Sequence, residues 1–222
     1  YEKERQGNLM IDILSHIVEF RNGESGLHVL HVRTLTELLL RMLSQKTDRY
    51  RLTPEEISII TTASALHDIG KIAIDEHILN KPGRLTEEEF AMMKTHTTVG
   101  ADMLENLPIH QNDPLVNVAY QICRWHHERY DGRGYPDGLK EDSIPISAQV
   151  VALADVYDAI TSQRVYKPPF SHEEAVQMIL DGKCGVFNPL LLECLRENAE
   201  AIRAGLAANS QAQRDQREMR NV

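Results

Sequence analysis

The 222-residue sequence has few cysteines and no long apolar run. Its three cysteines (Cys123, Cys184 and Cys194) are odd in number, widely spaced and set among apolar residues, which predicts buried thiols in a reducing compartment and argues against a disulfide framework. No apolar run approaches the roughly 18 residues of a membrane span, and residues 1–5 do not resemble a signal peptide. We therefore expect a cytoplasmic protein with no membrane span.

The sequence also lacks an excess of basic residues. It has 24 Lys and Arg against 33 Asp and Glu, a formal net charge of -9. A protein that binds duplex nucleic acid needs a basic face, so this balance argues against such a partner. It does not exclude a small anionic substrate, because bound metal ions dominate the local field. With 42% apolar residues, the chain can form one fairly large domain with a real core.

Amphipathic segments, capping boxes and turn residues predict an all-α bundle, with no strand alternation and no internal repeat. The capping box at Thr53 opens a helix that we expect to run into His67 and Asp68 and to end at Gly70. We expect the other helices over residues 4–20, from about 27, from 86 toward 96, from 113 through 127, over 147–162, and after 171 and 188. Residues 130–145, rich in Gly and Pro, form a turn-rich loop.

Three regions are predicted along the chain. Residues 1–22 form a connector helix, whose apolar face includes Leu9, Ile13, Ile17 and Phe20. Because the first residue is not Met, we expect this helix to follow an upstream sensory or receiver domain and to be able to pair in a homodimer. Residues 23–204 form the main domain. Residues 205–222 are polar and rich in Gln and Arg, which predicts a polar tail that forms a solvated or frayed helix.

Two adjacent pairs, His67–Asp68 and His126–His127, offer imidazole and carboxylate ligands, which suit divalent metals such as zinc, iron or manganese. His96 and Asp155 stand on separate predicted helices among apolar residues, where a carboxylate is costly to bury unless it is paired or metal-bound. Each residue alone is as well explained as a satisfied core group or a helix cap, but the set favours a metal site. We interpret five other histidines as ordinary surface or helix residues: His16, His31, His77, His110 and His172.

The motifs around these residues stand in a fixed order. They are His67-Asp68-Ile69-Gly70-Lys71, Asn80-Lys81-Pro82-Gly83, Met93-Lys94-Thr95-His96, His126-His127-Glu128, Asp131-Gly132-Arg133-Gly134-Tyr135-Pro136-Asp137-Gly138-Leu139 and Ala154-Asp155-Val156-Tyr157-Asp158-Ala159-Ile160-Thr161-Ser162. Over roughly residues 23–195 the chain resembles the HD-GYP family, a bacterial branch of the HD phosphohydrolases that hydrolyses cyclic di-GMP. The resemblance implies an HD-domain helical bundle with a turn-rich GYP loop.

The resemblance also implies roles for individual residues. The metal ligands would be His67, Asp68, His96, His126, His127 and Asp155, with Glu24 and His28 matching a pair that gives some members a third metal. It implies two or three divalent ions, with iron or manganese favoured and zinc, nickel or cobalt as alternatives. Asp68 and Lys71 would be catalytic. Lys71 would contact the scissile phosphate, and the basic pair Arg164 and Lys167 would grip the phosphates; the alternative for all three is ordinary surface charge.

The GYP loop, residues 131–136, needs its glycines for positive φ or a close backbone approach. It would be a lip over the site or a docking surface for a signalling partner such as a diguanylate cyclase; the alternative is a mere tight turn. Two positions depart from the family pattern, because His31 stands where members usually carry Arg and Asn188 where an Asp commonly precedes Pro. Asn caps a helix about as well as Asp.

The function expected from these features is that of a metal-dependent phosphodiesterase in bacterial second-messenger signalling. It would hydrolyse cyclic di-GMP to the linear dinucleotide, and on to GMP if a third metal binds. Two other readings remain open: an HD hydrolase of another cyclic or linear nucleotide, and a catalytically silent module that senses a nucleotide or binds a partner. Every ligand position of the motif is filled, which favours activity.

Overall fold

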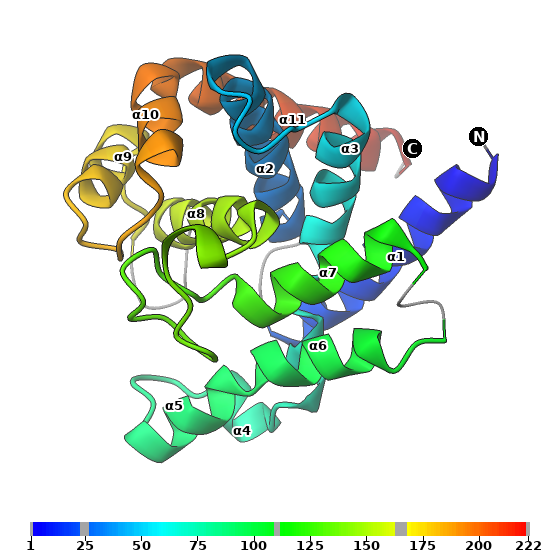
Figure 1. Cartoon of the computed structure of the whole chain (residues 1–222). Helices are drawn as coiled ribbons and strands as arrows, with labels where there is room; N and C mark the ends of the chain where they lie inside the picture. Colours follow the sequence, from blue (N-terminus) through cyan, green and yellow to red (C-terminus); the bar gives the residue numbers. More distant parts are fainter. Residues whose placement is uncertain (1, 23–26, 109–111, 163–167, 221–222) are drawn as a thin grey trace.

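The computed structural model describes residues 2–22, 27–108, 112–162 and 168–220, and over these residues it is all-α, as predicted (Figure 1). Apart from one isolated bridge between Lys183 and Gly185, these residues form no β-structure. The α-helices are α1 (Glu2–Arg21), α2 (His28–Lys46), α3 (Pro54–Ala63), α4 (Glu76–Leu79), α5 (Glu87–Lys94), α6 (His96–Glu105), α7 (Pro114–Trp125), α8 (Ile146–Thr161), α9 (His172–Leu180), α10 (Pro189–Glu197) and α11 (Ala199–Arg220).

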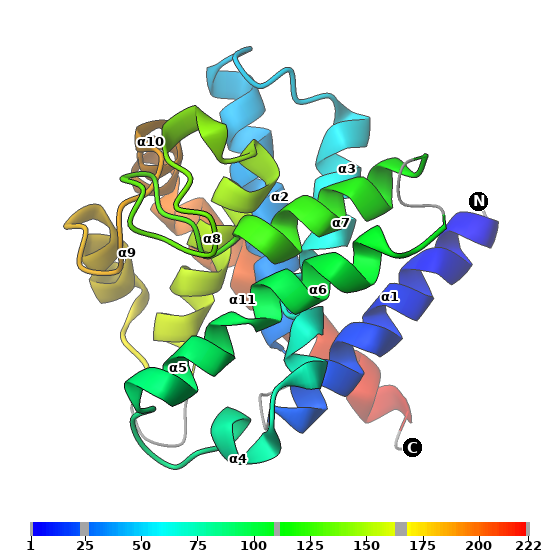
Figure 2. The same ribbon diagram turned by 60° about the horizontal axis from the view of Figure 1, so that its bottom comes forward.

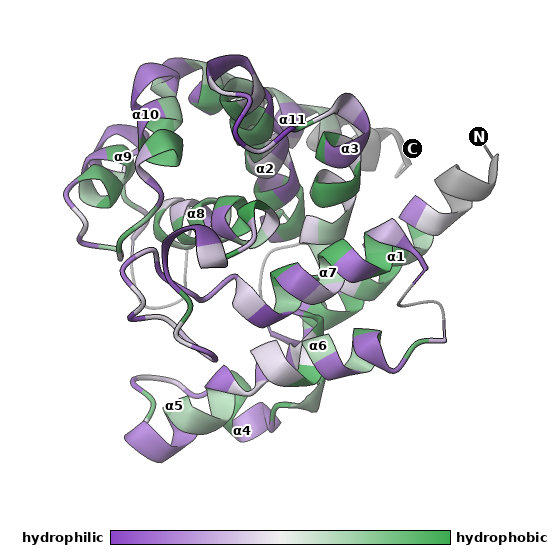
Figure 3. Cartoon of the chain, in the orientation of Figure 1, coloured by the Kyte–Doolittle hydropathy of each residue, from purple (hydrophilic) through white to green (hydrophobic). Residues whose placement is uncertain are grey.

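Helices α2 and α8 form the centre of the bundle and pack against each other. The inward stripe of α2 is fully buried at Val32, Leu39 and Leu43, with the spacing of an amphipathic helix. Helix α8 is buried at every position of residues 147–154, and Figure 3 shows it as mostly hydrophobic. Helices α3, α10 and α11 cover α2, so the core of the domain surrounds these two helices.

Capping residues begin the helices where the sequence predicts. Thr53, Thr86 and Ser171 each form a complete capping box with the Glu three residues later. Asn188 accepts a hydrogen bond from the backbone N–H of Leu190 at 2.9 Å, so it caps α10 as Asp would. The bounds of these helices are therefore set by local sequence.

The predicted helix running into His67 and Asp68 is wrong. Helix α3 ends at Ala63 and is followed by two short 3-10 helices, η1 (Ser64–Leu66) and η2 (Ile69–Ala73), with His67 and Asp68 between them. The Ser64 carbonyl, which would accept from Asp68 in an α-helix, instead accepts from the backbone N–H of His67 at 3.3 Å and faces its Nδ1 at 2.9 Å. The local chain therefore turns at the two candidate ligands.

Gly70 does not end a helix; it permits a close approach to α6. A Cβ at this position would lie 1.9 Å from the His96 carbonyl oxygen and 2.6 Å from the Gly100 backbone nitrogen, so no larger residue fits. Helix α6 also packs along α7, and the two lie side by side in both views (Figures 1 and 2). These contacts bring the 64–73 segment, the start of α6 and the end of α7 together.

Helix α1 is attached to the domain by hydrogen bonds. The Ser15 hydroxyl donates to the Ala65 carbonyl at 2.8 Å. The guanidinium of Arg21 donates to the carbonyls of Lys71, Ile72 and Ile74 at 3.0, 2.5 and 2.7 Å. The helix expected to be a connector therefore buttresses the η1–η2 segment directly.

Helix α11 runs without a break across residue 205, where the sequence predicts the start of a solvated tail. Leu206 packs against the core, and a Cβ on Gly205 would lie 2.9 Å from the Leu38 side chain. Asn209 and Ser210 bond to Thr34 and His31 of α2, each at 2.8 Å. This part of the predicted tail is therefore packed on α2 through Leu206 and through the hydrogen bonds of Asn209 and Ser210.

The three cysteines are free. Cys123 and Cys194 are buried, as predicted, and Cys184 is partly buried. Burial raises the pKa of the Cys123 thiol. No helix in the described part of the chain is long and apolar enough to cross a membrane.

Candidate metal centre

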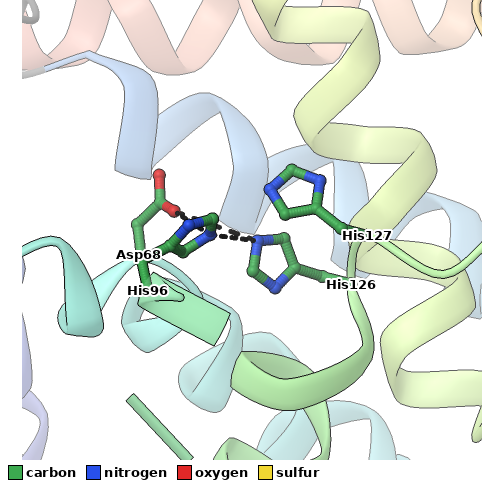
Figure 4. Close-up of side chains that lie close together, drawn as sticks. All are labelled: Asp68, His96, His126 and His127. Carbon is green, nitrogen blue, oxygen red and sulfur yellow. Dashed lines mark hydrogen bonds and ion pairs between the residues drawn. The ribbon is translucent and has the colours of Figure 1, made fainter. Parts of the chain in front are cut away.

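Two groups of side chains with metal-ligand atoms lie where α2, the η1–η2 segment, α6, α7 and α8 meet. Within each group the ligand atoms lie within 4.8 Å of one another, close enough for one ion to be held by all of them. The first group (Figure 4) is Asp68, His96, His126 and His127, and the second is His28, His67 and Asp155. The seven residues come from five parts of the chain, and six of them are those the HD-GYP resemblance implies as the core ligand set.

Asp68 lies between the two groups. Its Oδ1 is 3.3 Å from His96 Nε2 and 3.9 Å from His126 Nε2, whereas its Oδ2 is 3.3 Å from His67 Nε2. Each oxygen of one carboxylate thus faces a different group. This is the geometry of a carboxylate that can bridge two ions.

The hydrogen bonds of the histidines fix which nitrogen carries the proton. His67 Nδ1 lies 2.9 Å from the Ser64 carbonyl, His96 Nδ1 lies 2.7 Å from the Met93 carbonyl, and His126 Nδ1 lies 2.9 Å from the Ile122 carbonyl. A carbonyl oxygen only accepts, so each Nδ1 donates. In the neutral rings each Nε2 therefore turns a lone pair toward the centre of its group, as metal-binding histidines do.

These lone pairs face one another at short distance. The two Nε2 atoms of His96 and His126 lie 3.5 Å apart, and those of His28 and His67 lie 3.3 Å apart. Two acceptors cannot share a hydrogen bond, and Asp68 Oδ1 is buried with no hydrogen-bond partner. A cation bound between these atoms would satisfy them all, so the donor set fits a divalent metal with nitrogen and oxygen ligands.

Burial keeps the histidines of the first group neutral. It lowers the pKa of His126 to about 3, with His67 and His96 adding to the effect. Burial likewise lowers the pKa of His96 and holds that of His127 well below its usual range. Neutral imidazoles are the form that binds metals.

The pKa values of His67 and Asp68 shift in the directions that favour their charged forms. Burial alone would lower the pKa of His67, but the attraction and hydrogen bond of Asp68, together with the charge of Asp155, outweigh it and raise that pKa. Burial alone would raise the pKa of Asp68, but Lys71 and His67 outweigh it and hold that pKa well below its usual range. Lys71 Nζ lies 2.5 Å from Asp68 Oδ2, so the lysine expected at the scissile phosphate stands at the edge of the candidate metal centre.

His28 belongs to the second group. Its Nε2 lies 3.3 Å from His67 Nε2 and 3.8 Å from Asp155 Oδ1. The resemblance pairs His28 with Glu24 for a third metal; Glu24, like Arg164 and Lys167, lies outside the described residues.

Asp158 is a residue of the site that the sequence analysis did not single out. Its Oδ2 lies 2.7 Å from His28 Nδ1, and its Oδ1 lies 2.6 Å from His31 Nδ1. Burial alone would raise the pKa of Asp158, but hydrogen bonds from His28 and His31 outweigh it and lower that pKa. His31 is therefore not an ordinary surface histidine. The spacing of Asp158, one helical turn after Asp155, was the available signal.

The GYP loop is anchored against the first group. The carboxylate of Glu128 accepts hydrogen bonds from the backbone N–H groups of Asp137 and Gly138 at 2.7 and 2.9 Å. A Cβ on Gly134 would lie 2.3 Å from the Glu128 Cα, so only glycine fits there. The Tyr135 ring stacks on the His127 imidazole with 4.8 Å between ring centroids. The loop thus packs directly on a candidate metal ligand.

The arrangement defines a class of protein: an all-α bundle with His and Asp ligand groups joined at a His-Asp pair. A model of the HD domain family matches residues 8–185. The chain belongs to that family, and its relatives confirm the resemblance to HD-GYP proteins.

Two curated relatives come from Vibrio cholerae serotype O1. One, a "Probable cyclic di-GMP phosphodiesterase", is 43% identical over 196 residues, covering 86% of this chain and 44% of the relative. The other, a "3'3'-cGAMP-specific phosphodiesterase 2", is 38% identical over 212 residues, covering 90% of this chain and 38% of the relative. The chain therefore spans less than half of either relative.

A solved structure shares the fold. The crystal structure of a cyclic GMP-AMP specific phosphodiesterase of V. cholerae matches with a TM-score of 0.64 and 20% sequence identity, covering 93% of this chain and 52% of that chain. At this identity the likeness concerns the fold alone, and it agrees with the all-α HD-domain architecture predicted from the sequence.

Proposed function

We propose that this protein is a metal-dependent phosphodiesterase that hydrolyses cyclic di-GMP in second-messenger signalling. The observation that carries the proposal is Asp68, whose two carboxylate oxygens face two separate groups of nitrogen and oxygen ligands. The relatives named as cyclic di-GMP phosphodiesterases, 43% and 41% identical to this chain, support the substrate.

The metal ligands in this proposal are His28, His67, Asp68, His96, His126, His127 and Asp155. Metal ions held by these residues would supply Lewis acidity toward the phosphodiester. Iron or manganese suits the imidazole and carboxylate set, as zinc, nickel and cobalt also do. Glu24 would add a further carboxylate beside His28 if a third ion binds, and the reaction would then continue from the linear dinucleotide to GMP.

The chain's own cations position the substrate. Lys71 forms an ion pair with Asp68, and Arg21 donates hydrogen bonds to the η2 segment that bears Lys71. The Lys71 ammonium group is therefore placed to bind a phosphate oxygen at the candidate metal centre. Arg164 and Lys167 would bind the second phosphate of the dianionic ring. A positioned cation stabilises charge that develops on a phosphoryl group during displacement.

A second candidate substrate is a mixed cyclic dinucleotide. Relatives named as 3'3'-cGAMP-specific phosphodiesterases, 38% and 28% identical to this chain, favour it. The chemistry at the metal centre is the same for both substrates, because both present a 3'–5' phosphodiester. The two differ in one base, which residues away from the metal ligands would distinguish.

Two surfaces are proposed to bind protein partners: the exposed face of α1 and the GYP loop. The exposed apolar face of α1 is proposed to pair in a homodimer or to continue from an upstream sensory or receiver domain. The GYP loop is proposed to dock a signalling partner such as a diguanylate cyclase. A cytoplasmic location fits this chemistry.

The experiment is hydrolysis by the purified chain loaded with manganese or iron under anaerobic conditions. Cyclic di-GMP and 3'3'-cGAMP are supplied separately, and products are followed by ion-exchange chromatography. We expect cleavage of cyclic di-GMP, and none in the Asp68→Asn variant loaded in the same way. Preferential cleavage of 3'3'-cGAMP would replace the first substrate with the second. Metal-loaded protein that cleaves neither would contradict the proposal.

A further inference from the structure

Helices α2 and α8 present two layers of side chains to each other. His28 and Asp155 face the second ligand group, and one turn further along the same helices His31 and Asp158 face each other. His31 follows His28 by three residues on α2, and Asp158 follows Asp155 by three residues on α8. Side chains three residues apart lie next to each other on a helix surface. The layer formed by His31 and Asp158 lies directly behind the candidate ligands.

Asp158 fixes the orientation of His28. Its Oδ2 accepts from His28 Nδ1 at 2.7 Å, which leaves His28 Nε2 as the lone-pair nitrogen facing His67 and Asp155. The other oxygen, Oδ1, accepts from His31 Nδ1 at 2.6 Å and from the Ser162 hydroxyl at 2.9 Å. Asp158 is 3% exposed, so these donors are the groups that hold its carboxylate in place.

The network continues to helix α11. His31 Nε2 lies 2.8 Å from the Ser210 hydroxyl, and that hydroxyl donates its hydrogen to the Leu206 carbonyl at 2.9 Å. His31 is therefore hydrogen-bonded through both ring nitrogens, to Asp158 on one side and to Ser210 on the other.

We infer that His31 and Ser210 are positioning residues for His28, acting through Asp158, and that helix α11 thereby supports the candidate metal centre. The inference rests on the metal-binding role proposed above. The hydrogen bonds of the His31 ring run to Asp158 and Ser210, neither of which is a candidate ligand. They restrict the Asp158 carboxylate, which orients the candidate ligand His28. Loss of such an outer partner typically lowers metal affinity about 10–100-fold.

The test is metal binding. Chelator-stripped protein is titrated with Mn²⁺, free ion is measured by its electron paramagnetic resonance signal, and spin coupling reports a manganese pair. We expect His31→Leu to weaken binding of the second Mn²⁺ ion about 10–100-fold while the first ion still binds tightly. Ser210→Ala should act in the same direction with a smaller effect. His31→Arg, which keeps a donor toward Asp158, should restore much of the affinity.

A matched control lies next to Ser210. Asn209→Ala removes a hydrogen bond from α11 to Thr34 of α2 but leaves the His31 network intact, so both equivalents should bind as in the wild type. Thermal unfolding of every variant reports the stability of the fold.

The outcomes separate the inference from the proposed function. Two ions bound by the wild type and also, with equal affinity, by His31→Leu would overturn the inference alone. Equal weakening of both equivalents with a lower melting temperature, unrelieved by His31→Arg, would show a merely structural role and also overturn it. Fewer than two ions bound by the wild type would overturn the metal centre and the inference together.

Discussion

The carboxylate of Asp68 is held by residues of its own η1–η2 segment and by a residue of α6. Lys71 follows it by one turn of η2, His67 precedes it, and His96 approaches it from α6. A buried carboxylate is stable as an anion only when opposite charges or donors surround it. The same surroundings aim its two oxygens at the two ligand groups.

We predict that Asp68→Asn and His126→Ala each remove binding of at least one metal ion. Asn keeps the size of Asp but loses the charge that bridges two cations, and Ala at position 126 removes a buried Nε2 ligand. Hydrolysis should fall by more than about 100-fold, beyond the loss that outer-shell changes cause. Metal content and turnover measured on the same samples check this, and circular dichroism checks that the helices persist. Wild-type turnover in either variant would show that the reaction occurs elsewhere.

The histidines of the first group predict how pH affects the metal-free protein. Burial lowers the pKa of folded His126 to about 3, whereas an unfolded histidine titrates near 6.5. Between these values only the unfolded state binds the proton, so the free energy of unfolding should fall as pH drops from about 6.5 toward 3.

Urea unfolding of chelator-stripped protein at pH 7 and pH 5 measures this loss. His126→Asn should reduce it, by up to about 2 kcal/mol at pH 5, because the titrating group is gone while the polar side chain remains. Identical pH dependence in the variant and the wild type would show that His126 is protonated in the folded state.

At the scale of elements, the GYP loop is packed against the candidate site. Backbone N–H groups of Asp137 and Gly138 are held by Glu128, and Tyr135 stacks on His127. The loop is shaped by contacts with residues 127–129, which follow helix α7 and include the candidate ligand His127. Its conformation and the position of His127 should therefore change together.

We predict that Gly134→Ala destabilises the protein by about 1–3 kcal/mol and lowers turnover, because the new Cβ would meet the backbone of residues 127–129 at 2.3–2.5 Å. Gly7→Ala is the matched control. It makes the same change in helix α1, where a Cβ meets nothing within 4 Å, so stability should stay the same or rise. Thermal unfolding and steady-state kinetics measure both; a Gly134→Ala protein as stable as the wild type would contradict the tight packing.

At the scale of the whole molecule, α1 has two apolar faces. One is buried at Ile11 and Val18 against the domain, and the other is exposed. The exposed face includes Met10, Ile13, Ile17 and Phe20, which are 58%, 43%, 55% and 88% exposed. Their 3-4-3 spacing is that of the apolar seam of a two-stranded coiled coil.

We predict that the protein dimerises through this face and that Ile17→Glu makes it monomeric, because a charge in the seam cannot be buried without a partner. Light scattering coupled to size-exclusion chromatography measures the mass. Met103→Glu is the control, since Met103 is 40% exposed on α6 and is not one of the seam residues, so the change should leave the dimer unchanged. A wild-type protein that is monomeric at every concentration would contradict the prediction.

The sequence by itself determined the helical class, the starts of most helices and the identity of the candidate ligands. Helix starts were predictable because capping acts within three residues, as at Thr53, Thr86 and Ser171. The ligands were predictable because His67-Asp68 and His126-His127 stand in motifs with a fixed order. Both kinds of information are local in the chain.

Only the tertiary structure decided how these residues meet. The turn at His67 and Asp68 depends on Gly70 pressing against α6, a contact with residues about 30 positions away. The support of His28 by Asp158, His31 and Ser210 joins three helices. The sequence around Ser210 does not predict this role, because a polar residue in a polar segment is expected to face solvent. Only the packing of α11 on α2 brings it to His31. Contacts between distant segments depend on packing, and packing is a property of the folded chain.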